Sequence, residues 1–133
     1  MNFNLKNKVI IVTGGAKGIG NAICNVLAEE GAIPFIVGRG KEAVLAAVKG
    51  IKDKGGNASY AITELTDPEQ CKAAIAAAVA EFGTVDGLVN NAGVNDGIGL
   101  ENGDANRFIE SLKKNLVHYY LMAQQALPYL KEN

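Results

Sequence analysis

The residues best suited to chemistry form a glycine-rich turn near the start of the chain. The turn reads Thr13-Gly14-Gly15-Ala16-Lys17-Gly18-Ile19-Gly20, between a β-branched apolar run and a segment with helical spacing of apolar residues. Gly14 permits a sharp turn, Gly18 leaves room for a ligand's pyrophosphate, and Gly20 permits close packing of the helix. The free N–H groups of the helix N-terminus then face the phosphates. No Gly-Lys-Ser/Thr follows, as a P-loop would require. The segment predicts a dinucleotide-binding turn, with a purely structural tight turn as the alternative.

The end of the next apolar run bears on the choice between NAD and NADP. A carboxylate at this place binds the ribose 2′-hydroxyl of NAD and repels the 2′-phosphate of NADP. Here the sequence reads Gly38-Arg39-Gly40-Lys41, and no acid occurs before Glu42. Arg39 can pair with a 2′-phosphate through two hydrogen bonds, and Lys17 can add a second positive charge. We therefore expect a preference for NADP, with NAD as the other candidate. In the alternative interpretation both cations are solvated surface residues.

Short apolar runs alternate with longer helical stretches along the whole chain. The expected strands cover residues 8–13, 33–37, 58–63 and 85–90, and the expected helices cover 18–30, 41–54, 68–82 and 104–131, the last interrupted late by Pro128. This alternation indicates parallel strands joined by right-handed crossovers. The sequence therefore predicts an α/β fold, a three-layer doubly wound parallel sheet of the Rossmann type that is incomplete, with strand order 3-2-1-4. In this interpretation residues 1–133 form one dinucleotide-binding domain.

Length, charge and cysteine content exclude other classes. The 133 residues suffice for one domain with its own core. Lys and Arg total 13 and Asp and Glu total 14, which argues against nucleic acid or an anionic membrane as the main partner. No apolar run is long enough to span a membrane, and the start lacks the features of a signal peptide. Cys24 and Cys71 are far apart in the sequence, and the single histidine, His118, is near neither of them, so we expect no metal site. The two cysteines form no disulfide framework, and we therefore expect a reducing, cytoplasmic location.

A second motif follows the fourth expected strand and reads Asn90-Asn91-Ala92-Gly93. Leu65-Thr66-Asp67 and Asn115 agree with the two motifs in order and spacing. Together they resemble the short-chain dehydrogenases/reductases, and the resemblance covers essentially the whole chain. The segments at residues 87–100 and 115–120 look more narrowly like the bacterial L-fucose (aldose) dehydrogenases of this family.

The resemblance implies which residues contact the cofactor. The glycine turn would hold the pyrophosphate. Glu64 and Leu65 would lie at the adenine, although the family more often has Asp at the first of these positions. The Asn91–Gly93 segment would lie beside the nicotinamide ribose, and Asn90 and Asn91 would also stabilise the sheet. The expected cofactor-binding residues are Gly14, Gly15, Ala16, Lys17, Gly18, Ile19, Gly20, Arg39, Glu64, Leu65, Asn91, Ala92 and Gly93.

Of the family's catalytic residues, the sequence offers one. Asn115 would be the tetrad asparagine, whose main chain holds a water in the proton relay; the alternative is a solvent-facing Asn. Because Asn is unfavourable inside a helix, a local irregularity is expected there. No tyrosine has Lys four residues later, so the Tyr-x-x-x-Lys pair and its preceding Ser are missing. We therefore expect the chain to be part of a longer enzyme, inactive alone, with an open apolar edge at Val85, Leu88 and Val89.

The narrower resemblance implies a sugar substrate. An L-fucose-like aldose would be oxidised at C1 to its lactone, and the polar side chains of Asn95 and Asp96 could contact its hydroxyls, although loop polarity explains them equally well. The alternatives are a 3-oxoacyl-type carbonyl reductase and a non-catalytic nucleotide-binding module. His118, the single histidine, is expected to be a packing or surface residue, with a role at the substrate or at a subunit interface as the alternative. The resemblance to the family also implies that the last helix pairs with a second copy in a homodimer or homotetramer through its apolar face, which consists of Phe108, Leu112, Leu116 and Leu121.

Overall fold

The fold is built on one parallel sheet. The structure, a computed structural model, describes residues 1–131. Its sheet has the strand order β3-β2-β1-β4, which the sequence predicted. All pairings are parallel. The strands are β1 (Val9–Thr13), β2 (Ile33–Gly38), β3 (Ser59–Ile62) and β4 (Gly87–Val89).

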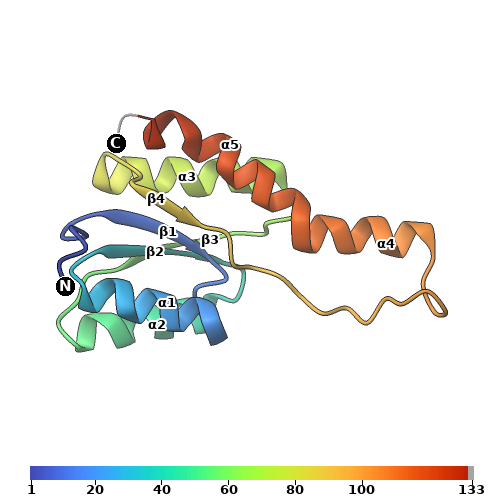
Figure 1. Ribbon diagram of the computed structural model, residues 1–133, viewed down its shortest axis with the longest axis horizontal. Coiled ribbons are helices and arrows are strands. Elements are labelled where there is room, and N and C mark those ends of the chain that lie inside the picture. Colours follow the sequence, from blue (N-terminus) through green and yellow to red (C-terminus); the bar gives the residue numbers. More distant parts are fainter. Residues whose placement is uncertain (132–133) are drawn as a thin grey trace.

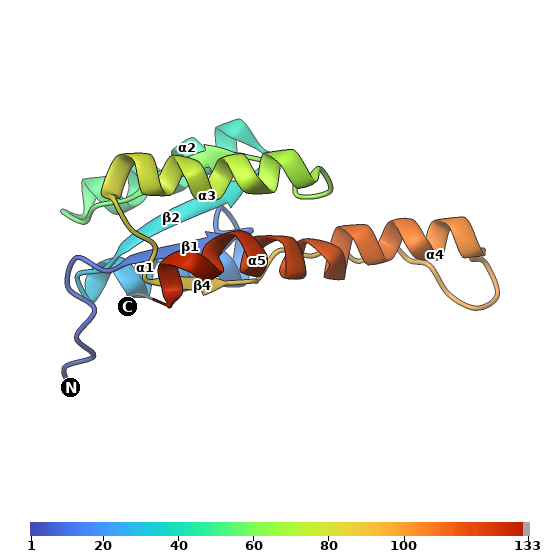
Figure 2. The same ribbon diagram turned by 90° about the horizontal axis from the view of Figure 1, so that it is seen from above.

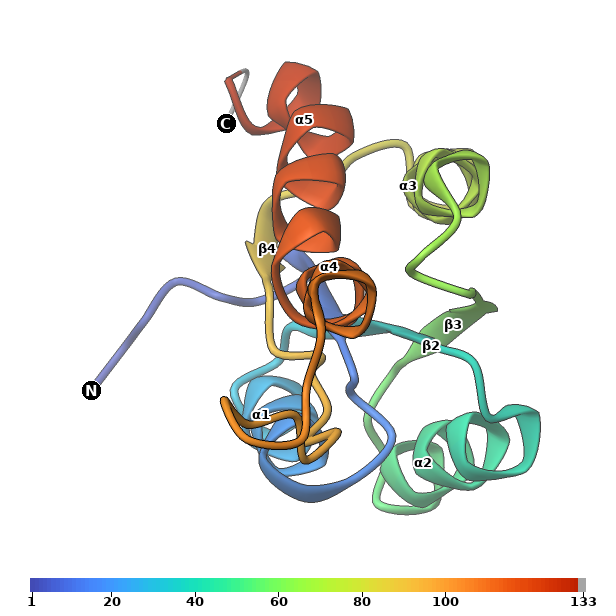
Figure 3. The same ribbon diagram turned by 90° about the vertical axis from the view of Figure 1, so that its right-hand side faces the viewer.

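Helices cover both faces of this sheet, as Figures 1 and 3 show. The helices are α1 (Gly18–Glu29), α2 (Lys41–Asp53), α3 (Pro68–Phe82), α4 (Ala105–Leu112) and α5 (His118–Leu130), and a π-helical turn covers Lys113–Val117. The start of α3 follows the sequence signals: Pro68 is its first residue, and the Asp67 side chain accepts a hydrogen bond from the N–H of Glu69 at 3.0 Å.

Alternate residues of the central strand belong to two separate cores. Val9 and Ile11 pack in the core formed with α3 and α5, whereas Ile10 and Val12 pack in the core formed with α1 and α2. Because successive side chains of a strand point to opposite faces, a run that is apolar throughout requires cover on both faces. The continuous β-branched run therefore accounts for the three-layer arrangement.

The last expected helix differs from the structure in two ways. Instead of one helix over 104–131, α4 and α5 are joined by the π-helical turn, which contains Asn115. The expected irregularity thus occurs where a helix-disfavoured residue stands. The expected interruption at Pro128 is wrong, because α5 continues through it to Leu130. A proline this close to a helix end removes one backbone donor without ending the helix.

The fourth strand is shorter than expected, and one of its residues lies elsewhere. β4 covers only Gly87–Val89, and Val85 lies before it, fully buried in the core with α3 and α5. Val85 is therefore not part of an open edge. Leu88 and Val89 are half-buried, and β4 is an edge strand of the described sheet.

The segment after β4 extends beyond the sheet. In Figures 1 and 2 the loop that leads into α4, and α4 itself, project away from the strands, while α5 returns over them beside β4. Within residues 1–131, no helix combines the length and the apolarity that crossing a bilayer would demand.

Candidate functional site

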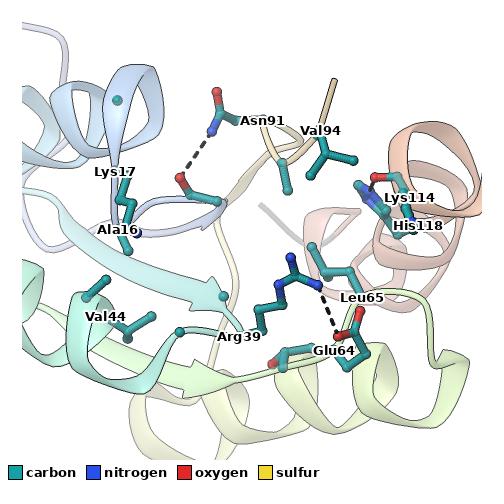
Figure 4. Close-up of a pocket in the computed structure, with 18 of the residues that line it drawn as sticks. Ala16, Lys17, Arg39, Val44, Glu64, Leu65, Asn91, Val94, Lys114 and His118 are labelled. Atoms are coloured by element: carbon teal, nitrogen blue, oxygen red, sulfur yellow. Dashed lines mark hydrogen bonds and ion pairs between the residues drawn. The ribbon is translucent and has the colours of Figure 1, made fainter. Parts of the chain in front are cut away.

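A cleft of about 770 Å³ lies at the carboxyl ends of the strands, where open parallel sheets bind ligands. Figure 4 shows side chains from the glycine turn, the ends of β2 and β3, and the π-helical turn around it. Most of the expected cofactor residues line it: Gly14, Ala16, Lys17, Gly18, Ile19, Arg39, Glu64, Leu65, Asn91, Ala92 and Gly93. The fold therefore brings together residues that are far apart in the sequence.

The glycine turn combines an open position with a crowded one. Gly14 and Gly18 have φ of +66° and +54°, which side-chain-bearing residues rarely adopt. A Cβ at Gly18 would meet nothing within 4 Å, so its backbone borders open space. A Cβ at Gly20 would overlap the carbonyl oxygen of Gly14 and lie 2.5 Å from Asn91 Nδ2. The open position fits a phosphate group, and the crowded one brings α1 close to the turn.

Two expected cofactor residues, Gly15 and Gly20, do not line the cleft. Gly20 is buried, and a Cβ there would overlap the carbonyl oxygen of Gly14. Gly15 is also buried, and a Cβ there would lie 2.9 Å from the Cys24 sulfur. Burial raises the pKa of the Cys24 thiol to about 12. Both glycines therefore permit close packing of the turn and do not form the wall of the cleft.

Thr13 joins the glycine turn to the second motif. Its Oγ1 accepts hydrogen bonds from the N–H groups of Asn91 at 3.0 Å and Ala92 at 3.1 Å. Asn91 Nδ2 in turn donates to the carbonyl oxygens of Thr13 at 3.1 Å and Gly14 at 3.3 Å. The Asn91 side chain thus bonds to the turn and also lies at the cleft wall. Sequence reasoning missed Thr13 as a functional support, because its partners lie about 78 residues away.

A cation and an acid face each other at the ends of β2 and β3. Arg39 Nη1 lies 3.8 Å from Glu64 Oε2, and both side chains line the cleft. Lys17, which also lines the cleft, is exposed at the start of α1, and Lys114 lines the cleft from the π-helical turn. Three positive groups therefore border the cleft, and one of them, Arg39, has a carboxylate beside it.

Asn115 connects the loop after the second motif to the π-helical turn. Its Oδ1 accepts a hydrogen bond from the N–H of Val94 at 2.7 Å, and its Nδ2 donates to the carbonyl oxygen of Ser111 at 3.1 Å. The side chain is thus bonded inward, and the solvent-facing alternative is wrong. Asn115 itself is not among the lining residues.

The loop residues Asn95 and Asp96 differ in their placement. Asn95 is exposed, lies outside the cleft and accepts from the N–H of Gly97 at 3.1 Å. Asp96 lines the cleft and its Oδ1 accepts from Ser111 Oγ at 3.1 Å. Its Oδ2 is buried and has no hydrogen-bond partner within residues 1–131. Of the two, only Asp96 lines the cleft, and its unpaired oxygen is buried.

His118 is buried at the same end of the cleft. The residue is 1% exposed, and its Nε2 lies 2.7 Å from the carbonyl oxygen of Lys114. Since a carbonyl only accepts, Nε2 carries a proton and donates it to this bond. Nδ1 is buried and has no partner in the described part of the chain. Of the interpretations that the sequence allowed for His118, a surface position is wrong, whereas packing and a place at the cleft both agree with the structure.

Other lining residues also escaped the sequence analysis. They are Gly38, Gly40, Ala43, Val44, Thr63, Thr66, Val94 and Lys114. Several directly follow strands β2 and β3, so the rule that ligands bind at the carboxyl ends of parallel strands would have found them. Lys114 carries no such signal, because only the return of α5 brings it there.

Comparison with known proteins gives the family. The family model described as short chain dehydrogenase matches residues 8–133. The chain is 41% identical over 95 residues to a 3-oxoacyl-[acyl-carrier-protein] reductase of Chlamydia muridarum, an alignment that covers 71% of this chain and 38% of that protein.

Two solved structures are similar over nearly the whole chain. One is the L-sorbose reductase of Gluconobacter frateurii complexed with NADPH and L-sorbose, with a TM-score of 0.93 and 26% identity over 99% of this chain and 51% of that one. The other is an NADH-dependent reductase complexed with NAD, with a TM-score of 0.91 and 29% identity over 99% of this chain and 55% of that one. The chain thus spans 38% to 55% of the length of these proteins. None of the three is a fucose dehydrogenase.

Proposed function

Because the chain belongs to the short-chain dehydrogenase family, we propose that its cleft binds a nicotinamide dinucleotide and that it carries the cofactor-binding half of an NAD(P)-dependent oxidoreductase. One observation carries this proposal: the open backbone at Gly18 and the Asn91–Gly93 segment border one cleft, held together through Thr13. When bound, the nicotinamide supplies the hydride acceptor or donor. Residues from Gly14 to Ile19 would hold the pyrophosphate, and Leu65 would lie at the adenine.

We propose NADP as the preferred cofactor. Arg39 and Lys17 place positive charge at the cleft, and a 2′-phosphate is the anionic group by which NADP differs from NAD. One similar structure holds NADPH and another holds NAD, so both cofactors occur among relatives. Titration of the protein with both dinucleotides tests the preference. Tighter NAD than NADP binding that an Arg39→Ala substitution leaves unchanged would refute it.

The substrate we propose is an aldose such as L-fucose, oxidised at C1 to its lactone. One feature supports a hydroxyl-rich substrate: Asp96 and His118 line one cleft, each has a buried polar atom (Oδ2 and Nδ1) without a hydrogen-bond partner within residues 1–131, and hydroxyl groups both donate and accept. In this reaction C1 gives a hydride to the cofactor and its hydroxyl gives up a proton. Asn115 is assigned to the proton relay through its main chain, and the sequence holds no Tyr-x-x-x-Lys pair to which the proton transfer itself could be assigned.

A 3-oxoacyl-type carbonyl reductase is the second candidate, favoured by the identity to the Chlamydia muridarum reductase. We assign the protein to the cytoplasm, where its two free cysteines stay reduced. Assays of the full-length protein of which we expect this chain to be a part, with L-fucose, with D-arabinose and with an acetoacetyl thioester, distinguish the candidates. Sugar-dependent formation of NADPH supports the aldose, NADPH oxidation with the thioester supports the reductase, and activity with neither supports a non-catalytic nucleotide-binding module.

A further inference from the structure

The cation proposed to meet the cofactor's 2′-phosphate already has an anionic partner. Arg39 Nη1 and Glu64 Oε2 are 3.8 Å apart, and Figure 4 shows the two side chains pointing toward each other at the cleft. The Arg39 side chain is 73% exposed and that of Glu64 41% exposed. Solvent weakens such a pair, so a ligand can displace it.

The Glu64 carboxylate is held in place by its own loop. Its Oε1 accepts hydrogen bonds from Thr66 Oγ1 at 3.0 Å and from the Thr66 N–H at 3.4 Å. The N–H of Glu64 donates to Gln70 Oε1 at 2.7 Å. With one oxygen tied to Thr66, the other faces Arg39. A phosphate arriving at Arg39 therefore meets a fixed negative charge.

We propose that Glu64 is a specificity-determining residue, an internal counter-ion that competes with a 2′-phosphate for Arg39. This inference rests on the proposed function, because it requires a dinucleotide in the cleft. A 2′-phosphate must loosen the ion pair and approach the Glu64 carboxylate, and like charges repel. A 2′-hydroxyl brings no charge and leaves the pair intact. Glu64 therefore lowers the ratio of the affinity for NADP(H) to the affinity for NAD(H), and it does so by pairing with Arg39 rather than by occupying the phosphate position.

The test compares dissociation constants of NADPH and NADH for four proteins: wild type, Glu64→Gln, Arg39→Ala and the double variant. The sequence has no tryptophan, so calorimetry or the fluorescence of the bound dihydronicotinamide serves as the readout. Gln keeps the acceptor for Thr66 and removes the charge. Glu110→Gln is the matched control, because Glu110 also pairs with a surface cation, Lys113 at 3.0 Å, outside the cleft.

We expect Glu64→Gln to raise the affinity for NADPH relative to NADH about three- to fivefold over wild type; a lost contact with the adenine would change both constants alike and leave their ratio unaffected. The gain should shrink in the Arg39→Ala background and at high salt, and Glu110→Gln should change neither constant. An unchanged NADPH to NADH ratio in Glu64→Gln, or an equal gain without Arg39, overturns the inference. Wild type that binds neither dinucleotide overturns the proposed function as well.

Discussion

At the scale of single residues, the glycine turn and Thr13 leave the least freedom for substitution. A Cβ at Gly20 would overlap the carbonyl oxygen of Gly14, and Thr13 Oγ1 holds two backbone N–H groups of the second motif. The glycine spacing was sufficient to predict where the chain needs to be small. The partners of Thr13 could not be predicted, because nothing local in the sequence pairs it with Asn91.

Substitution of Gly20 by alanine is expected to destabilise the protein by about 1–3 kcal/mol, because the added methyl group overlaps backbone that cannot move alone. Urea denaturation measures the change. Gly50→Ala in α2 is the control: nothing lies within 4 Å of its Cβ, and we expect a gain of about 0.5–1 kcal/mol. Equal effects of the two substitutions would contradict the packing described for Gly20.

Substitution of Thr13 by valine keeps the shape of the side chain and removes the acceptor for two part-buried N–H groups, those of Asn91 and Ala92. We expect a loss of about 1–3 kcal/mol in the free energy of unfolding. Thr63→Val is the comparison, since Thr63 is also buried and its hydroxyl makes one longer bond, 3.3 Å to the carbonyl oxygen of Ala61. If Thr63→Val costs as much as Thr13→Val, the role assigned to Thr13 is wrong.

The Cys24 thiol is expected to resist alkylation in the folded protein. Burial raises its pKa to about 12, so at about pH 8 almost none of it is the reactive thiolate. The raised pKa also means that ionisation favours unfolding: stability is lost as pH rises above the unfolded value of 9.0. Mass spectrometry after iodoacetamide treatment should show labelling of Cys24 only in denaturant. Labelling at equal rates with and without denaturant would show that the thiol is accessible.

At the scale of elements, the π-helical turn is the feature that shapes the end of the cleft. It carries Lys114 and Asn115, and its end places His118. The sequence was sufficient to predict an irregularity at Asn115, since Asn disfavours helix interiors. It was insufficient for Pro128 and for the bounds of β4, where packing against neighbouring elements outweighs local preference.

Replacing Asn115 by alanine is expected to release the loop after the second motif. The Asn115 side chain accepts from the N–H of Val94 at 2.7 Å, and without it that amide should exchange with solvent faster. Hydrogen–deuterium exchange of the 93–100 segment measures the effect. Gln124→Ala, at an exposed position of α5, serves as the control. Unchanged exchange in Asn115→Ala would mean that the loop is held by other contacts.

At the scale of the whole molecule, the fold follows from the sequence more fully than the site does. Alternating strands and helices predict the parallel sheet and its order, because few topologies satisfy the crossover rules. The positions of Asp96 and His118 depend on how the loop after β4 packs against α4, the π-helical turn and α5. These contacts join residues far apart in the sequence, so no local pattern predicts them.

Self-association through α4 and α5 remains a prediction at this scale. Of the predicted apolar face, Phe108 and Leu116 are each 57% exposed, whereas Leu121 packs against the core formed with α3 and α5. Exposed apolar side chains favour a subunit contact. Sedimentation should show a dimer or tetramer that Leu116→Glu converts to monomers. Val26→Glu, equally exposed at 57% on α1, should leave the assembly unchanged. A monomeric wild type would refute the prediction.

The central claim is that a dinucleotide binds at the carboxyl ends of the strands. Hydrogen–deuterium exchange with and without NADPH tests it most directly, because it locates the ligand on the chain. With NADPH we predict slower amide exchange in the segments 14–20 and 91–93, which contribute residues to the cleft wall and are joined by the hydrogen bonds of Thr13. We predict no change in exchange at residues 54–56, which lie outside the cleft. Exchange that NADPH leaves unchanged in both cleft segments would contradict the account.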